Sequence, residues 1–145
     1  DKYNEVNSHH FLLEDIDGHI DFGEGMNGIY AHGENYQILN QHHGYAQLVT
    51  NTYGKGRSIY FAGLPYSPQN CRLLLRAIYW AAGKEDEMKK YYVSNVNTEV
   101  ASFESVGKIA VINNTTEALC TDLYVSGNKV ETLNLSPMEL RWITI

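Results

Sequence analysis

The sequence changes character near Tyr91, and this change constrains the fold more than any other feature. Before it, one amphipathic segment carries complete helix punctuation: Ser67 stands where an N-cap belongs, Pro68 lies in the first turn, and Gly83 follows the last apolar residue. These signals predict a helix over residues 68–82. After Tyr91 every run reads as a short strand, so the fold class is expected to be α+β, with a mixed unit followed by a β unit.

The runs after Tyr91 are short, evenly spaced and separated by turn residues, which is typical of a small antiparallel β-sandwich over residues 91–145. Alternation predicts that Leu140 and Trp142 share the core-facing side of the last strand. The expected strands are 99–103, 108–113, 119–125, 129–135 and 139–145.

The first unit, residues 1–86, begins with a polar stretch that is expected to be mostly loop. Three aromatic and branched runs, GIYAH, YQILN and YAQLVTN, then predict a β-meander. The run RSIYFAGL is nearly continuously apolar, which favours a strand covered on both faces.

Helical spacing places the apolar residues of the predicted helix on one face, with its arginines on the other. Arg72, Arg76 and Tyr79 are expected to face away from the core. The residues expected to be buried are Leu73, Leu74, Ala77, Ile78 and Ala81.

The stretch YGKGRSIYFAGLPYSPQN could suggest a phosphate-binding loop, but its order is wrong. The glycines around Lys55 precede a strand instead of opening a helix, so they predict a hairpin turn. The part AGLPYSPQN does join a strand to a helix N-terminus, where ligands often bind. We favour a capped connection there, with Tyr66 packing across it, over a ligand site.

Neither the cysteines nor the histidines form a recognisable site. Cys71 lies inside the first helical turn, without the small flanking residues of a nucleophile elbow, so a buried or half-buried thiol is favoured. The pairs His9-His10 and His42-His43 are read as surface turns instead of metal ligands. The carboxylates between Glu14 and Glu24 lack the spacing of an EF-hand loop and predict a solvated acidic loop. We therefore expect no catalytic, substrate-binding or metal site residues in this chain.

Composition excludes several classes of partner. The net charge is −6 and no Lys/Arg cluster occurs, which argues against nucleic acid. No apolar run reaches the roughly 18 residues of a membrane span. Cys71 and Cys120 lie in unlike contexts and do not suggest a disulfide framework, which fits a reducing, cytoplasmic location.

Four stretches, IDFGEGMNGIYA, YGKGRSIYFAGLPYSPQNCRLLLRAIYWAAG, GKIAVINNT and LSPMELRWITI, make the chain resemble the C-terminal part of bacterial 1,3-β-galactosyl-N-acetylhexosamine phosphorylases, also called lacto-N-biose or galacto-N-biose phosphorylases. The resemblance runs nearly end to end. DFGEG and PMELRW narrow it to the phosphorylases, whereas the strand and helix pattern is shared more loosely with amidotransferase-like domains.

The resemblance implies an enzyme with a catalytic (β/α) barrel, an amidotransferase-like middle domain and a small C-terminal β-domain. Residues 1–86 are similar to the end of the middle domain and residues 91–145 to the β-domain. The implied reaction is reversible phosphorolysis of β-1,3-galactosyl-N-acetylhexosamine to α-galactose 1-phosphate and GlcNAc or GalNAc, with inversion. A carboxylic acid and the attacking phosphate perform it, and no cofactor beyond that co-substrate is implied.

The family's catalytic residues belong to the barrel, so none is assigned to this sequence. We therefore expect a non-catalytic, structural and oligomerising portion of the enzyme, inactive alone, whose partners are the missing barrel, the rest of the middle domain and a second copy. An alternative is a carbohydrate-binding β-sandwich module, suggested by the tyrosines and Trp142. A third reading, a free-standing amidotransferase-like enzyme, lacks an elbow nucleophile.

Overall fold

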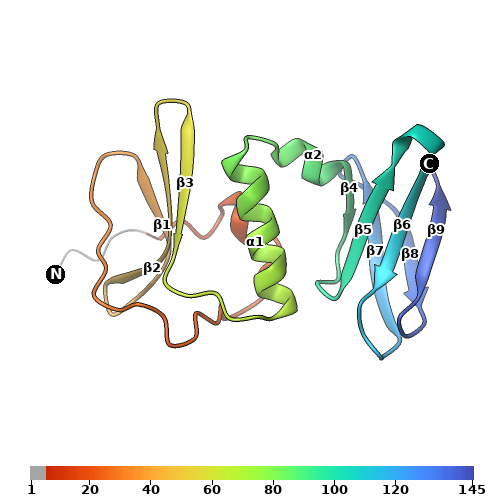
Figure 1. The fold of residues 1–145 in the computed structure, drawn as a ribbon, viewed down its shortest axis with the longest axis horizontal. Coiled ribbons are helices and arrows are strands. Elements are labelled where there is room, and N and C mark those ends of the chain that lie inside the picture. Colours follow the sequence, from red (N-terminus) through yellow and green to blue (C-terminus); the bar gives the residue numbers. More distant parts are fainter. Residues whose placement is uncertain (1–5) are drawn as a thin grey trace. The chain divides into compact units, whose positions relative to one another are not determined.

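The computed structural model describes residues 6–145, which divide into two compact units, Asp1–Lys84 and Glu85–Ile145 (Figure 1). The first unit contains a sheet and a long helix, and the second is almost entirely strand. The α+β class predicted from the sequence is confirmed, as is the small β-sandwich. No helix in the described part of the chain has the length and hydropathy that crossing a membrane requires.

The sheet of the first unit is an antiparallel meander in the order β1-β2-β3. Its strands are β1 (Tyr36–His42), β2 (Tyr45–Tyr53) and β3 (Gly56–Phe61). His43 and Gly44 join β1 to β2 with positive φ angles of 49° and 81°, as the tight turns of two-residue hairpins require. The turn between β2 and β3, where Tyr53 pairs with Gly56, confirms the hairpin predicted around Lys55.

Helix α1 (Pro68–Ala81) confirms the predicted helix to within one residue. Together with the 3₁₀ turn η1 (Phe11–Leu13) it covers one face of the sheet. Ile38 and its neighbour Leu39 point to opposite faces of β1, so Ile38 belongs to a second, smaller cluster with Ala46 and Val49. The main core of this unit consists of Leu12, Ile20, Phe22, Leu39, Leu48, Leu73, Ala77 and Trp80.

The helix turns a different face to the core than its apolar spacing predicted. Leu74 and Ile78 are 43% and 57% exposed, and Ala81 is exposed too, so their predicted burial was wrong. Arg72 and Arg76, predicted to face solvent, are buried instead. The physical reason is a set of acceptors that the sequence does not place near them.

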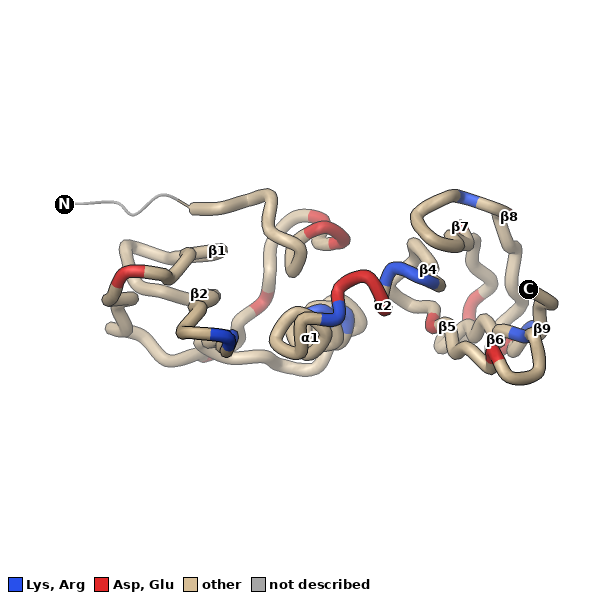
Figure 2. Tube along the Cα trace, turned by 90° about the horizontal axis from the view of Figure 1, so that it is seen from above, with Lys and Arg blue, Asp and Glu red and all other residues tan. Residues whose placement is uncertain are grey.

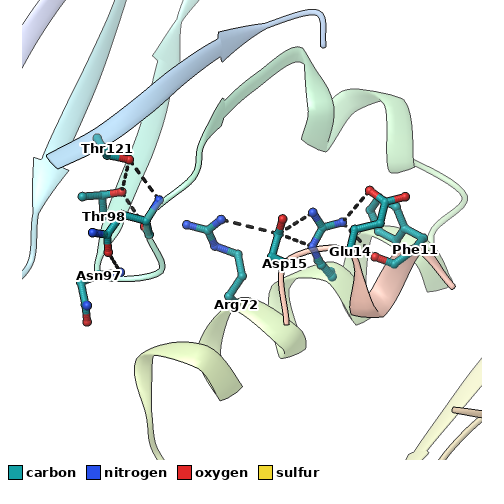
Figure 3. A network of polar contacts seen from close by, with 9 residues as sticks. Phe11, Glu14, Asp15, Arg72, Asn97, Thr98 and Thr121 are labelled. Atoms are coloured by element: carbon teal, nitrogen blue, oxygen red, sulfur yellow. Dashed lines mark hydrogen bonds and ion pairs between the residues drawn. The ribbon is translucent and has the colours of Figure 1, made fainter. Parts of the chain in front are cut away.

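Those acceptors come from η1 and the residues that follow it (Figure 3). The carboxylate of Asp15 pairs with Arg76 and lies 3.7 Å from Nη1 of Arg72. Arg76 also donates from Nη1 to the carbonyl of Phe11 at 2.9 Å and pairs with Glu14 at 3.5 Å. Buried guanidinium groups are tolerated where a carboxylate and carbonyl oxygens neutralise and satisfy them.

The second unit opens with the short helix α2 (Glu85–Lys90). Two three-stranded antiparallel sheets follow, in the orders β4-β7-β8 and β5-β6-β9. The side chains packed between them include Val93, Ile109, Val111, Leu123, Leu133 and Leu135. The strands are β4 (Tyr91–Val93), β5 (Thr98–Phe103), β6 (Lys108–Asn113), β7 (Leu119–Val125), β8 (Asn128–Leu135) and β9 (Leu140–Thr144).

Four other sequence-based expectations about strands were wrong or incomplete. The run GIYAH is not a strand: Gly28 and Gly33 flank it with positive φ, and it contacts β2 through a single backbone hydrogen bond, from the Ala46 amide to the Ile29 carbonyl at 2.8 Å. Strand β3 lies at the edge of its sheet and is exposed or half-buried throughout, not covered on both faces. Leu140 and Trp142 point outward, and the three-residue strand β4 was too short to be recognised.

Candidate functional site

The polar residues that the sequence offered for metal or acid–base chemistry are dispersed. Within residues 6–145 no group of three or more His, Cys, Asp or Glu side chains is arranged to hold a metal ion. Asp15 is half-buried against arginines, and Asp21 accepts a hydrogen bond from the Gly23 amide at 2.7 Å. Asp17 and Glu24 are exposed. The acidic stretch is therefore partly structural, because Asp15 holds α1 in place.

The histidines also have structural roles. The ring of His10 accepts the Leu12 amide at 3.2 Å and caps η1, and it meets the Trp80 ring edge-on at a centroid distance of 5.2 Å. His42 and His43 contact each other at the exposed hairpin turn, with ring centroids 4.0 Å apart. The rings of His42 and His43 thus lie at a surface turn, as the sequence indicated.

Perturbed pKa values lie on exposed or half-buried groups at the surface. A hydrogen bond to Tyr45 raises the pKa of Tyr30, and one to Glu104 raises the pKa of Lys90. Tyr30 is 68% exposed and packs edge-on against Tyr45. Shifts that arise in exposed pairs do not mark an enclosed site where a proton would be transferred.

In the first unit, the stretches DFGEG and FAGLP, which belong to the resemblance described above, contact each other through their backbones. The amide of Met26 donates to the carbonyl of Ala62 at 2.8 Å. A Cβ at Gly63 would lie 2.3 Å from the Phe22 carbonyl oxygen, and one at Gly25 would lie 2.8 Å from that of Ala62. Such contacts leave no room for a side chain, so DFGEG and FAGLP need their glycines for close packing.

The helix start at this junction is held by side chains. Asn70 is 2% exposed and donates from Nδ2 to the carbonyls of Asp21 and Pro65, at 2.9 and 2.8 Å. The hydroxyl of Ser67 accepts the Asn70 amide at 3.0 Å, as an N-cap does. The capped connection favoured from the sequence is therefore present. The expected packing of Tyr66 across it was wrong, because Tyr66 is 90% exposed.

Cys71 follows in the first turn of α1, with its amide bonded to the Ser67 carbonyl at 2.9 Å. Both Cys71 and Cys120 are free and exposed, so the expectation of buried thiols was wrong. Each falls on the outward side of its element, a position that apolar content alone does not reveal.

Two apolar surfaces remain as candidate functional features. The α1 stripe, which we define as Cys71, Leu74, Leu75 and Ile78, recurs at helical spacing on the side opposite Leu73 and Ala77, and all four members are exposed. The aromatic patch, which we define as Phe103, Leu140 and Trp142, lies on the outer face of sheet β5-β6-β9. Sequence reasoning missed both, although the surplus of apolar residues around α1 was a signal.

Charge distinguishes these surfaces from nucleic-acid sites. Figure 2 shows basic positions singly or in short groups along the described trace, with acidic positions between them. The net charge is −6, and the described positions show no long basic run; that nucleic acid is not a partner stays a prediction.

Comparison with known proteins finds a matching family model for each of the two units. Residues 1–86 match the model of the lacto-N-biose phosphorylase central domain, and residues 91–143 match that of the lacto-N-biose phosphorylase C-terminal domain. A 1,3-β-galactosyl-N-acetylhexosamine phosphorylase of Lachnoclostridium phytofermentans is 43% identical over 144 residues, which cover 99% of this chain and 20% of that protein.

Other relatives extend the comparison. The 1,3-β-galactosyl-N-acetylhexosamine phosphorylase of Bifidobacterium longum is 40% identical over 125 residues, which are 86% of this chain and 17% of that protein. A D-galactosyl-β-1→4-L-rhamnose phosphorylase of L. phytofermentans is 35% identical over 78 residues, 54% of this chain and 11% of that protein. The chain thus spans about a fifth of the length of the first of these relatives. With both of its units matched, the chain belongs to the lacto-N-biose phosphorylase family.

Proposed function

We propose that this chain is a non-catalytic, structural part of a disaccharide phosphorylase. The longer protein would reversibly phosphorolyse β-1,3-galactosyl-N-acetylhexosamine to α-galactose 1-phosphate and GlcNAc or GalNAc, with inversion. Relatives up to 43% identical are named for action on this class of disaccharide, and the chain spans about a fifth of their length. That fifth matches a central and a C-terminal domain.

The observation that carries this proposal is the α1 stripe. Leu74, Leu75 and Ile78 are 43%, 44% and 57% exposed on a helix whose opposite side already packs against a sheet. A helix that is apolar on both sides is typically sandwiched between two layers. We propose that the first unit is the end of an amidotransferase-like domain and that further elements of that domain, together with the catalytic barrel, are its partners.

The same stripe supports self-association of the isolated chain, because a contiguous apolar surface is more stable covered than hydrated. Light scattering tests this, with a concentration-dependent rise in mass expected. A strict monomer at all concentrations would contradict it.

The cytoplasmic location stays a prediction.

The structural role is tested in a chimera. The L. phytofermentans relative would receive this chain in place of its own matching residues, and galactose 1-phosphate release from lacto-N-biose would be measured. We expect the chimera to be active and the purified 145-residue chain alone to be inactive. Release of galactose 1-phosphate by the chain alone would overturn the proposal.

A substitution in the stripe sharpens this test. Ile78→Glu should change the stability of the isolated chain by no more than about 0.5 kcal/mol, because the side chain is exposed there. In the chimera it should lower the soluble yield and the thermal inactivation temperature, because the charge would be buried. Val130→Glu is the matched control, at 56% exposure in the second unit, and should be neutral in both settings.

A second candidate function is sugar binding by the β-sandwich. The exposed Trp142 favours it, because only a ring at the surface can stack on a sugar. Alternation had predicted that this ring lies in the core.

A further inference from the structure

The aromatic patch is built across three strands of the second unit. The register aligns Ala101 of β5, Ala110 of β6 and Trp142 of β9 in one row on the outer face of the sheet. Ile109 and Val111 alternate with Ala110 and belong to the core, so the row with Trp142 faces away from the core. Alanines beside a tryptophan leave room for the large ring to lie over the sheet.

The ring of Trp142 reaches across the central strand to Phe103 of β5, with a centroid distance of 5.3 Å and an angle of 56° between the ring planes. Ala110, on the strand between them, is only 2% exposed. Trp142 itself stays 55% exposed and Phe103 44% exposed. The two rings therefore form a fixed apolar platform with open faces, at little further cost in side-chain entropy on binding.

A polar side chain borders the platform on one side. The row next to that of Trp142 contains Phe103, Lys108 and Thr144, with Lys108 on the central strand. Successive rows on one face of a sheet are about 7 Å apart, so the ammonium group of Lys108 can reach a sugar ring stacked on the platform. The row on the other side contains Glu99, Ile112 and Leu140, and Glu99 lies two rows, roughly 14 Å, from Lys108.

The size of the patch argues against a protein partner. Its three members, Phe103, Leu140 and Trp142, are 44%, 49% and 55% exposed. Since a large side chain of this kind presents up to about 150–250 Å², together they expose roughly 300 Å². A stable dimer needs about 800 Å² on each partner, whereas two adjoining aromatic rings, inclined to each other and with a polar neighbour, suit a small ligand.

We propose that the platform formed by Trp142 and Phe103 binds β-galactosides by stacking, with Lys108 available to the sugar hydroxyls. In a galactoside the axial 4-hydroxyl leaves adjacent ring C–H groups on one face, and this continuous apolar face matches an aromatic ring. The site lies in the second unit and involves no residue of the α1 stripe. The inference rests on the proposed function for its class of sugar, but its failure would leave the structural role of the α1 stripe standing.

The test uses the chain's two tryptophans, Trp80 and Trp142. In the Trp80→Phe variant, fluorescence reports on Trp142 alone. We expect methyl β-galactoside and lacto-N-biose to give a saturable change with a Kd on the order of millimolar. In the amide NMR spectrum of the wild-type chain, the shifts should centre on Phe103, Lys108 and Thr144.

Variants distinguish the platform from unspecific effects. Trp142→Ala should lose the NMR shifts and Lys108→Ala should weaken binding several-fold, whereas Tyr66→Ala, at a ring 90% exposed in the first unit, should leave binding unchanged. Methyl β-glucoside, which differs at the 4-hydroxyl, should bind more weakly. No saturable change up to 100 times the expected Kd, shifts that persist in Trp142→Ala, or equal binding of the glucoside would each overturn the proposal. So would shifts at the patch that follow protein concentration instead of sugar, since these would show self-association.

Discussion

Among residues 6–145, the buried charged side chains lie in the first unit, whereas the buried polar side chains of the second unit are all neutral. Arg72 and Arg76 are 7% and 2% exposed, and Asp15 reaches them from a segment 61 residues before Arg76 in the sequence. In the second unit the Thr98 and Thr121 hydroxyls lie 3.2 Å apart, near the turn that includes Asn97 (Figure 3). Asn113, fully buried, donates to the carbonyls of Glu117 and Ser136 at 2.8 and 2.9 Å.

The two units differ in where their buried polar groups find partners and in how fully their apolar surface is covered. The second unit satisfies its buried hydroxyl and amide groups within its own strands and turns, and it packs an apolar core between two sheets. The first depends on an ion pair between distant segments and leaves an apolar stripe on α1 uncovered. We infer that the second unit is the more self-sufficient of the two.

The largest expected effect is at the buried ion pair. Asp15→Asn keeps the shape but removes the negative charge beside two buried guanidinium groups, which should lower the free energy of unfolding of the first unit by about 4 kcal/mol. Urea unfolding followed by Trp80 fluorescence in a Trp142→Phe background measures this. Glu14→Gln, whose side chain is 40% exposed, is the control and should cost less than about 1 kcal/mol. Equal losses in the two variants would show that the pair is not essential to the first unit.

The second unit has the next largest effect. Leu133 is 1% exposed between the sheets, so Leu133→Ala should cost about 3 kcal/mol through lost burial and a residual cavity. Trp142 fluorescence in a Trp80→Phe background should report the loss, while the Trp80 transition, followed in a Trp142→Phe background, should stay where it was. Leu140→Ala, at a side chain 49% exposed, should have little effect. A single transition that moves at both tryptophans would contradict the independence of the two units.

Local signals were sufficient for most elements. Ser67, Pro68 and Gly83 act within a few residues of the helix ends, so they predicted α1 to within one residue. The glycines around Lys55 likewise predicted a turn, because φ preferences are properties of single residues. Strands β5 to β9 of the sandwich followed from alternation and turn residues, whereas the three-residue β4 was missed.

What the sequence could not show depends on distant partners. Arg72 and Arg76 looked solvent-facing because Asp15 and the Phe11 carbonyl are brought to them only by the tertiary fold. Trp142 looked buried because Leu140 and Trp142 form the more apolar side of β9. In the structure Ile143 takes the inward position instead, and the small Ala110 gives the Trp142 ring a place outside.

The smallest expected effect is a pH dependence at the turn between β8 and β9. The Ser136 amide donates to Glu139 Oε2 at 2.7 Å, and Arg141 pairs with Oε1 at 2.7 Å; these contacts lower the pKa of Glu139 below its ordinary value of 4.5. Because the folded pKa is depressed, the stabilisation is present above the unfolded pKa and is lost as the pH falls through the folded value. NMR titration of Glu139 should give a midpoint below 4.5.

The hydrogen bond from the Ser136 amide is the larger cause of the lowered pKa. Arg141→Ala should therefore raise the pKa of Glu139 while leaving it below 4.5. The size of this change shows whether the turn is held by its own backbone or mainly by an ion pair. The self-sufficiency of the second unit requires the backbone, whereas the first unit depends on an ion pair. A complete return to 4.5 in Arg141→Ala would mean that the ion pair dominates here too, and the contrast between the two units would be weaker than their buried groups suggest.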